Sequence, residues 1–332
     1  MQRPKGVLLY SGGLDSLLAG KILIEQNVDL VGLYCILPFY PPDVNPQNLR
    51  AVTIADQIGI KLEFYRCSLD YLEMVKNPPH GYGKRINPCI DCKIFFLTQA
   101  ARLMKRVGAD FVATGEVVGQ RPMSQLKHML IHLEKEAELI GRLLRPLSAK
   151  LLKPTIPELE GLIDREQLYG ISGRGRKVQM SLAEHFNIRD YSSPAGGCLF
   201  TDSNYAKRLS DLLGSHFIIL PEHLYLLTLG RYFRINQNTK LLISRNEQEG
   251  KELLKYSMEA DHFFIPDFKG PVALSIGSID EKEMETVCSI ISKYGNPNSN
   301  ENEVKVYKKG EMITSFKSTV QIEDTLLNSF RI

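Results

Sequence analysis

The first two hundred residues alternate short apolar runs with longer stretches in which apolar residues recur at helical spacing. The apolar runs predict strands, and the spaced stretches predict helices between them. The expected strands are residues 6–10, 30–37, 61–67 and 110–114, and the expected helices are residues 16–26, 48–58 and 91–107. This alternation predicts an α/β fold in which helices cover both faces of a parallel sheet. Ligands of such sheets bind beyond the carboxyl ends of the strands, so residues that follow each strand are the first functional candidates.

The pattern changes along the second half of the chain. One helix is expected from Asp164 and another over residues 176–186. After about residue 225, the expected strands are residues 231–235, 240–244, 263–266, 272–276, 304–308 and 312–316, and the expected helices are residues 246–258 and 281–294. We therefore expect two domains, residues 1–224 with the parallel sheet and residues 225–332 with a smaller α+β fold.

Composition narrows the class of protein. The chain has 332 residues, of which 43% are hydrophobic and 24% charged, a balance that excludes wholesale disorder. No apolar run approaches the roughly 18–20 residues of a membrane helix, and the first residues do not resemble a signal peptide. We therefore expect a cytoplasmic protein. Six cysteines are too few for a disulfide scaffold, so a cysteine cluster here would indicate metal or sulfur chemistry.

The strongest motif is Ser11-Gly12-Gly13-Leu14-Asp15-Ser16, which follows the first strand and opens the first helix. The glycine pair lets the backbone turn its N–H groups toward an anion, and the helix start adds partial positive charge. The Ser11 and Ser16 hydroxyls can donate to phosphate oxygens. Asp15 would repel a phosphate unless a Mg²⁺ lay between them. The plain alternative is a capped helix after a glycine turn.

Three cysteines stand in glycine- or proline-rich surroundings. Asn87-Pro88-Cys89-Ile90-Asp91-Cys92-Lys93 places two of them at a helix start, where the pKa of a thiol is expected to fall. Cys198 ends the turn Ala195-Gly196-Gly197-Cys198. The other three cysteines are expected to be packing residues: Cys35, Cys67 and Cys288. Cys67 follows a strand, so it can also border the site.

Four interpretations of Cys89, Cys92 and Cys198 remain open. The three thiolates can hold a 4Fe–4S cluster with one iron free of protein ligands. Two of them can act as a persulfide and a resolving thiol. A structural zinc would need a fourth ligand, which the sequence does not offer nearby. The spacing can also be coincidental.

A third motif follows the fourth strand: Thr114-Gly115-Glu116-Val117-Val118-Gly119-Gln120-Arg121-Pro122-Met123-Ser124-Gln125. Its glycines permit close backbone approach, and Gln120 offers hydrogen bonds to a base or ribose. Residues 172–177 form a basic turn before a helix. Six basic residues are expected to contact RNA: Lys84, Arg85, Arg121, Arg174, Arg176 and Lys177. The alternative is that they are ordinary solvated surface residues.

These motifs carry a family resemblance. Ser-Gly-Gly-Leu-Asp-Ser resembles the signature loop of the PP-loop ATP pyrophosphatases, which have a Rossmann-like fold. Residues 114–125 resemble a segment of tRNA 4-thiouridine synthases of the ThiI type, and Asn-Pro-Cys-x-x-Cys is similar to the MnmA-type tRNA 2-thiouridylases. A CxxC with one distant cysteine resembles the iron–sulfur-dependent thiolases of the TtuA type. After residue 225, Gly230-Arg231-Tyr232-Phe233-Arg234 and Ile243-Ser244-Arg245-Asn246-Glu247 resemble the RNA-associated NFACT-R module.

The resemblance implies an ATP-dependent tRNA sulfurtransferase. Such an enzyme adenylates a uridine carbonyl oxygen and replaces that oxygen with sulfur, releasing AMP and pyrophosphate. The residues implied to bind ATP, with Mg²⁺ at the aspartate, are Ser11, Gly12, Gly13, Asp15, Ser16, Gly115 and Gln120. Cys89, Cys92 and Cys198 would deliver the sulfur, on a cluster or as a persulfide. The implied partners are tRNA and a sulfur donor, either sulfide or a cysteine desulfurase relay; a homodimer is also compatible.

Two rival functions stay open at this point. A PP-loop ligase acting on a small molecule would share the phosphate loop, but amide-forming ligases need no thiolates. A non-catalytic RNA-binding protein with a structural metal site would explain the cysteines, but an anion cradle gains nothing from Asp15. The near-neutral charge of residues 229–332, with 14 basic and 15 acidic side chains, does not favour an extended phosphate track there.

Overall fold

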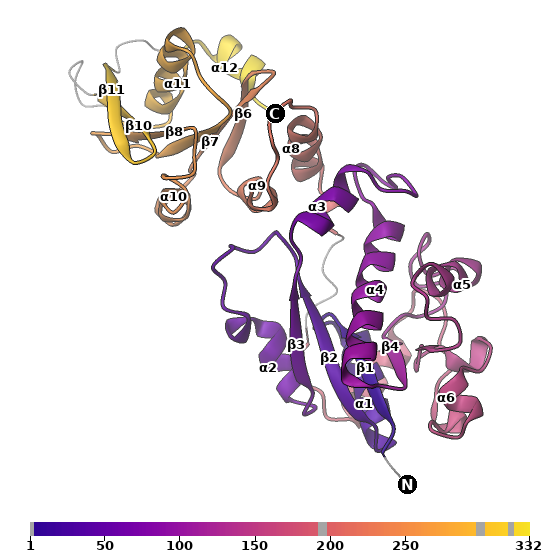
Figure 1. Ribbon diagram of the computed structural model, residues 1–332. Helices are drawn as coiled ribbons and strands as arrows, with labels where there is room; N and C mark the ends of the chain where they lie inside the picture. Colours follow the sequence, from indigo (N-terminus) through magenta and orange to yellow (C-terminus); the bar gives the residue numbers. More distant parts are fainter. Residues whose placement is uncertain (1–2, 192–197, 297–302, 318–321) are drawn as a thin grey trace. The chain divides into compact units, whose positions relative to one another are not determined.

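The computed structural model describes residues 3–191, 198–296, 303–317 and 322–332 (Figure 1). The chain forms two compact units, residues 1–198 and residues 199–332. None of the helices in the described part of the chain is long and apolar enough to cross a membrane.

The expected boundary near residue 225 falls inside the second unit. Helices α8 (Ser203–Leu213) and α9 (Pro221–Leu226) precede that residue. Arg208 of α8 donates to the carbonyl of Gly230 at 3.1 Å, next to the first strand of the unit. Lys240 of that unit's sheet forms a buried ion pair with Asp211 of α8 at 3.1 Å. These contacts explain why both helices belong with the second sheet.

A five-stranded parallel sheet forms the centre of the first unit, in the order β3-β2-β1-β4-β5. Its strands are β1 (Lys5–Tyr10), β2 (Asp29–Ile36), β3 (Lys61–Arg66), β4 (Phe111–Thr114) and the very short β5 (Leu143–Leu144). The four predicted strands are confirmed. The order reverses between β1 and β4, and the carboxyl ends of these two strands flank that switch point, where ligands of open α/β sheets bind.

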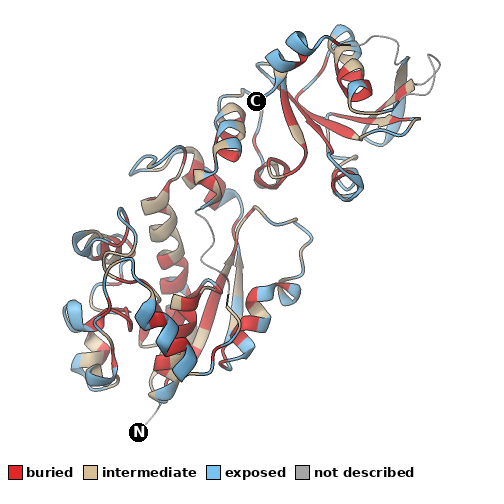
Figure 2. Cartoon of the chain, turned by 180° about the vertical axis from the view of Figure 1, so that it is seen from behind, coloured by how far each residue is buried: buried red, intermediate tan, exposed pale blue. Residues whose placement is uncertain are grey.

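Helices cover both faces of this sheet, as predicted. One face carries α1 (Leu14–Glu25), α2 (Arg50–Asp56) and α7 (Lys177–His185), and the other carries α4 (Cys89–Val107) and α5 (Lys127–Glu136). Two shorter helices, α3 (Leu69–Lys76) and α6 (Ile156–Leu159), complete the unit. Figure 2 shows that buried residues gather on the strands and on the inward sides of the helices. This packing fixes the loops at the carboxyl edge.

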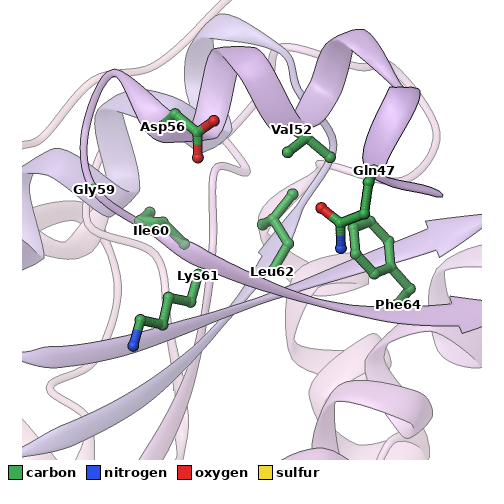
Figure 3. Close-up of a pocket in the computed structure, with 8 residues that line it drawn as sticks. All are labelled: Gln47, Val52, Asp56, Gly59, Ile60, Lys61, Leu62 and Phe64. Atoms are coloured by element: carbon green, nitrogen blue, oxygen red, sulfur yellow. The ribbon is translucent and has the colours of Figure 1, made fainter.

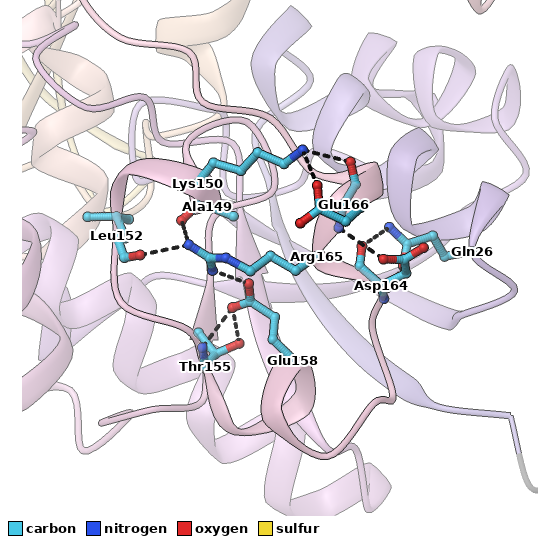
Figure 4. A network of polar contacts seen from close by, with 9 residues as sticks. All are labelled: Gln26, Ala149, Lys150, Leu152, Thr155, Glu158, Asp164, Arg165 and Glu166. Carbon is cyan, nitrogen blue, oxygen red and sulfur yellow. Dashed lines mark hydrogen bonds and ion pairs between the residues drawn. The ribbon is translucent and has the colours of Figure 1, made fainter.

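The helix expected from Asp164 is wrong. Asp164 caps only a three-residue 3₁₀ turn, Arg165–Gln167, by accepting the Glu166 N–H at 2.9 Å. The surrounding segment is a network of polar contacts (Figure 4). Asp164 exchanges hydrogen bonds with Gln26 at the end of α1, and Arg165 pairs with Glu158. Side chains therefore hold this segment against the sheet without a long helix.

The second unit contains a six-stranded antiparallel sheet in the order β11-β10-β8-β9-β7-β6. The strands are β6 (Arg231–Asn236), β7 (Thr239–Ile243), β8 (His262–Pro266), β9 (Ala273–Ile276), β10 (Glu303–Lys308) and β11 (Glu311–Lys317). The helices are α10 (Glu247–Leu254), α11 (Glu281–Lys293) and α12 (Asp324–Phe330). Buried residues of α11 and α12 pack with those of the sheet. The predicted α+β fold is confirmed.

The glycine before β6 explains part of the motif there. Gly230 has a φ of +59°, and a Cβ at this position would lie 2.5 Å from the carbonyl oxygen of Ile243. Its backbone also bonds to Glu249, which forms an ion pair with Arg245. The residues that carry the NFACT-R resemblance thus hold one corner of this sheet together.

Candidate nucleotide and sulfur-transfer site

The loop between β1 and α1, residues 11–16, is built around two serines. Gly12 adopts a φ of +74°, which turns the chain sharply after β1. The Ser16 hydroxyl donates to the Gly13 carbonyl at 2.8 Å and lies 3.2 Å from the Ser11 hydroxyl. The Ser11 N–H donates to the Ser16 hydroxyl at 3.3 Å. The structure therefore forms the predicted tight loop at the start of α1, a position suited to bind an anion.

Asp15 connects this loop to two later segments of the chain. The Gln120 amide and the Arg176 guanidinium both donate to its Oδ2, at 3.1 Å and 3.0 Å. Its other oxygen, Oδ1, is buried and has no hydrogen-bond partner within the part of the chain that the structure describes. A buried carboxylate oxygen without a donor fits a cation. Mg²⁺ is commonly bound by one carboxylate together with substrate phosphates and water, so Asp15 suits that ion.

The loop after β4, residues 114–125, lies directly against the start of α1. A Cβ on Gly115 would lie 2.5 Å from the Asp15 carbonyl oxygen and from the Ser16 nitrogen, so a larger residue would displace the backbone. Gly119 has a φ of +74°, and the Gly173 N–H donates to the Val118 carbonyl at 2.8 Å. The loop after β4 and the basic turn at residues 172–177 are therefore joined beside Asp15.

A buried ion network leads from this loop to the cysteine helix. Glu116 forms ion pairs with Lys93 of α4 and, at 3.1 Å, with Arg145. Burial alone would raise the pKa of Glu116, but the positive charges of Lys93 and Arg145 outweigh it and lower the pKa to about 2. Because Gly115 abuts Asp15 and Lys93 follows Cys92, this network connects the phosphate loop to the CxxC motif.

Cys89 and Cys92 open α4, as predicted. The Tyr71 hydroxyl lies 3.3 Å from the Cys92 Sγ. Burial raises the pKa of Cys92 to about 12, with the neighbouring Cys198, Cys89 and Asp91 adding to the rise, although the hydrogen bond from Tyr71 lowers it. The expectation that the helix start favours the thiolate is therefore wrong for Cys92, because burial and nearby negative groups oppose its ionisation.

Cys198 belongs with this pair. It is exposed, and its charge raises the pKa of both Cys92 and Tyr71, which places it within electrostatic range of them. The glycine-rich turn predicted at residues 192–197 lies outside the described residues. Cys67 and Cys288 are buried, as predicted, and the pKa of the Cys67 thiol is raised by its hydrogen bond with Cys35 and by burial.

The cysteine trio is not arranged around a single metal ion. Within residues 3–191 and the later described ranges, no group of three or more His, Cys, Asp or Glu side chains is placed to hold one metal ion. Cys89, Cys92 and Cys198 share one end of the unit, yet they do not converge on a common point. The proximity of Cys92 to its two neighbours suits thiol exchange.

The predicted RNA-contacting residues fall into two groups. Arg176 faces Asp15 and is therefore part of the phosphate-loop site. The remaining five are exposed at the surface: Lys84, Arg85, Arg121, Arg174 and Lys177. Lys84 and Arg85 lie in the connection between α3 and the CxxC helix, while Arg174 and Lys177 belong to the basic turn. Arg121 lies in the loop after β4, so exposed positive side chains come from three segments of this unit.

Sequence reasoning missed a second polar chain beside the CxxC motif. The Asp91 carboxylate accepts from the His80 backbone N–H at 3.2 Å and bonds to the His80 Nδ1 at 2.8 Å. The His80 Nε2 in turn lies 3.0 Å from the His132 Nε2 of α5. This chain holds the connection before α4 against the start of that helix. An acidic residue inside the CxxC motif was the available signal.

A separate pocket of about 350 Å³ lies between α2 and the edge strand β3 (Figure 3). Asp56 and Lys61 are the charged residues of its lining, and the rest of the lining is Gln47, Val52, Gly59, Ile60, Leu62 and Phe64. None of the residues predicted for the site lines it. The candidate site is therefore distinct from this pocket.

The fold and the site define the class of this protein. Its first unit is a Rossmann-like α/β domain with a tight loop suited to bind an anion at the switch point of a parallel sheet, and its second unit is a smaller α+β domain. Residues 230–331 match the model of the NFACT protein RNA binding domain.

The chain is similar over part of its length to proteins whose names describe tRNA modification. The chain is 31% identical over 174 residues to the tRNA-specific 2-thiouridylase MnmA of Sulfurimonas denitrificans, covering 48% of this chain and 50% of that relative. It is 29% identical over 192 residues to the protein of the same name from Thermus thermophilus, covering 49% and 50%. The chain thus spans about half the length of these relatives. A solved 4-thiouridine synthetase–RNA complex with bound ATP is 20% identical, covers 55% of this chain and 50% of its own, and has a TM-score of 0.34.

Proposed function

We propose that this protein is an ATP-dependent tRNA sulfurtransferase that replaces a uridine carbonyl oxygen with sulfur. One observation carries the proposal: a phosphate loop and a set of three cysteines occur in one α/β unit, joined by the Glu116–Lys93 ion pair. The sequence similarity to tRNA 2-thiouridylases and the match of the second unit to an RNA-binding domain support tRNA as the substrate.

The activation step would take place at residues 11–16. The uridine oxygen attacks the α-phosphorus of ATP, and pyrophosphate leaves from the start of α1, where N–H groups and the Ser11 and Ser16 hydroxyls stabilise its charge. Asp15 would hold Mg²⁺ through the oxygen that now lacks a donor. Mg²⁺ would neutralise charge on the departing pyrophosphate. Arg176 and Gln120, which now donate to Asp15, lie close enough to act on a bound phosphate.

The sulfur step would use the cysteine trio. A persulfide on Cys92 attacks the activated carbon, and AMP departs. Attack of Cys89 or Cys198 on the Cys92 sulfur then releases the transferred sulfur to the base and leaves a disulfide, which an external thiol reduces. In this route the outer sulfur of the persulfide comes from a cysteine desulfurase relay, which passes it on at the persulfide oxidation level. Sulfide would be the sulfur source only in the cluster route, where it would stay at the sulfide oxidation level. Burial raises the pKa of the Cys92 thiol to about 12, so this residue is mostly a neutral thiol at neutral pH before it receives sulfur.

A 4Fe–4S cluster on Cys89, Cys92 and Cys198 stays a prediction with its own test. Anaerobic reconstitution with iron and sulfide should then give broad absorbance near roughly 400 nm, and Cys89→Ala should remove it. A wild-type protein that transfers sulfur without binding iron would leave the persulfide route in place. Equal iron content in all three single cysteine variants would show that these residues are not the ligands.

The exposed basic residues of the first unit are the proposed contacts with tRNA. Lys84, Arg85, Arg121, Arg174 and Lys177 would contact the tRNA backbone, since basic side chains neutralise phosphates. We place the protein in the cytoplasm, where tRNA and reduced thiols occur together. A homodimer is compatible with this arrangement and is not required by it.

Mass spectrometry of tRNA nucleosides tests the proposal. Cells that lack this protein should lose one thiolated uridine, and the wild-type chain should restore it. A chain with Cys92→Ala should not restore it, whereas Cys288→Ala should, because Cys288 is buried in the second unit. Identical nucleoside profiles with and without the protein would refute tRNA thiolation as its function.

A further inference from the structure

A buried tyrosine lies against the sulfur of the CxxC pair. Tyr71, on α3, is 1% exposed, and its hydroxyl lies 3.3 Å from the Cys92 Sγ of α4. Buried tyrosine hydroxyls generally bond to a polar group that satisfies them. Here that group is the sulfur which the proposed function makes the sulfur carrier.

The ring of Tyr71 is held by the helix that carries Cys92. It contacts Phe95 edge-on with centroids 5.4 Å apart, and it stacks on Phe96 at 6.0 Å. Phe95 and Phe96 follow Cys92 by three and four residues, so they lie on the same side of α4 as that cysteine. The helix that presents the sulfur therefore also fixes the position of the hydroxyl beside it.

The hydroxyl lies among sulfur atoms from other segments as well. Cys198 and Cys67 are both within electrostatic range of Tyr71. In the resting thiol either Tyr71 or Cys92 can be the donor of their hydrogen bond. A sulfur anion carries no proton, so the tyrosine hydroxyl must then donate. Charge-assisted hydrogen bonds of this kind are about twice as strong as neutral ones.

We propose that Tyr71 is a positioning residue that orients the Cys92 sulfur and donates a hydrogen bond to it in its anionic form. This inference rests on the proposed function only in taking Cys92 as the sulfur carrier. The ring packing supplies the geometry and the hydroxyl supplies the interaction. Removal of the hydroxyl alone should leave the fold in place and weaken the reactivity of this one sulfur.

The test compares Tyr71→Phe with the matched control Tyr65→Phe. Tyr65 also packs on Phe95, at 6.0 Å, but its hydroxyl donates to Asp70. Alkylation of each cysteine by iodoacetamide is followed by peptide mass spectrometry on the full chain. Tyr71→Phe should slow alkylation of Cys92 roughly three- to ten-fold, because the loss of thiolate is partly offset by the higher nucleophilicity of a sulfur without the hydrogen bond. Tyr65→Phe should leave that rate within about two-fold of wild type, the scatter expected of such contacts.

A fluorinated tyrosine gives a second test of the hydrogen bond, and a thiolation assay tests the proposed function separately. A 3-fluorotyrosine installed at position 71 keeps the ring and strengthens the donor, so it should speed alkylation of Cys92. An equal or faster rate in Tyr71→Phe, or no gain with the fluorinated ring, would overturn the inference and leave Tyr71 as packing. Absence of tRNA thiolation by the wild-type protein would instead refute the proposed function while the alkylation result stood.

Discussion

At the scale of single residues, Asp15 is the centre of the site. Its carboxylate is shared between two donors, Gln120 and Arg176, while its second oxygen is buried without a partner among the described residues. A residue that only capped a helix would direct its oxygen toward the backbone of that helix. The observed arrangement instead suits a carboxylate that binds a cation through Oδ1. Bound phosphates would then replace Asp15 as the acceptor for Gln120 and Arg176.

Replacing this carboxylate should separate turnover from stability. Asp15→Ala is expected to lower ATP-dependent tRNA thiolation by roughly a hundred-fold or more, the usual cost of losing an electrostatic contact made to the transition state. The thermal midpoint should change little, since no core packing is removed. Glu25→Ala, on the exposed end of the same helix, is the control and should keep full turnover. Full turnover by Asp15→Ala would mean that Asp15 only pairs with Arg176.

At the scale of elements, the site depends on how closely the loop after β4 approaches α1. Gly115 permits this approach, and the apolar strands on either side fix where the two loops begin. Periodicity predicted these strands because buried parallel strands are continuous apolar runs. It failed at Asp164, where a side-chain cap and polar contacts hold a short turn, and it did not predict α3 or α5.

A methyl group at this approach should disrupt the site. In Gly115→Ala the new Cβ would meet backbone atoms of Asp15 and Ser16, which cannot move without shifting α1. We expect a loss of roughly 1–3 kcal/mol in the free energy of unfolding and weak ATP binding by calorimetry. Gly175→Ala is the matched control, because a Cβ there meets no atom within 4 Å. Wild-type ATP affinity in Gly115→Ala would contradict the close approach.

The buried ion pairs of Glu116 should make the free energy of unfolding depend on pH in the acid range. Its pKa is about 2 in the folded protein against an ordinary 4.5, so its stabilisation is present above pH 4.5 and lost as pH falls toward 2. Glu116→Gln should lower the free energy of unfolding by about 3 kcal/mol at pH 7. Urea unfolding should show this gap narrowing at pH values between 4.5 and 2. A gap that does not vary with pH would exclude the ion pairs as its cause.

At the scale of the whole molecule, the charge is spread thinly. The net charge is +3, and the second unit is nearly neutral, so the proposed binding of tRNA would depend on local groups of basic side chains and not on a broad basic surface. The exposed basic residues next to the cysteine helix are better placed to contact the backbone. The match of residues 230–331 to an RNA-binding domain adds a second candidate surface.

Salt dependence should show how many phosphates the first unit contacts. The double variant Lys84→Ala/Arg85→Ala should weaken tRNA binding and reduce the slope of log affinity against log salt by roughly 2, about one per lost contact. ATP affinity should stay unchanged. The control pair Lys105→Ala/Lys251→Ala removes exposed lysines elsewhere and should leave the slope alone. An unaltered slope in the first variant would remove these two residues from the proposed interface.

The site was partly predictable from the sequence for a physical reason. Glycines after strands and a cysteine pair at a helix start indicate chemistry directly, so Gly115, Asp15 and the cysteine pair stood out. Contacts between distant segments leave no such pattern: the ion pair of Arg176 with Asp15, or the approach of Tyr71 to Cys92, depends on which helices pack together. The same is true of Lys93 and Glu116, whose pairing appears only in the fold.

One measurement tests the central claim most directly. Purified protein is incubated with ATP, Mg²⁺, unmodified tRNA, a reducing thiol and a sulfur donor, and thiouridine and AMP are quantified in the same sample. Cysteine with a cysteine desulfurase and sulfide are used as donors in parallel reactions. The account predicts that each thiouridine formed is matched by one AMP, and that neither appears in the Asp15→Ala protein. ATP turnover that proceeds without tRNA and leaves every uridine oxygen in place would contradict it.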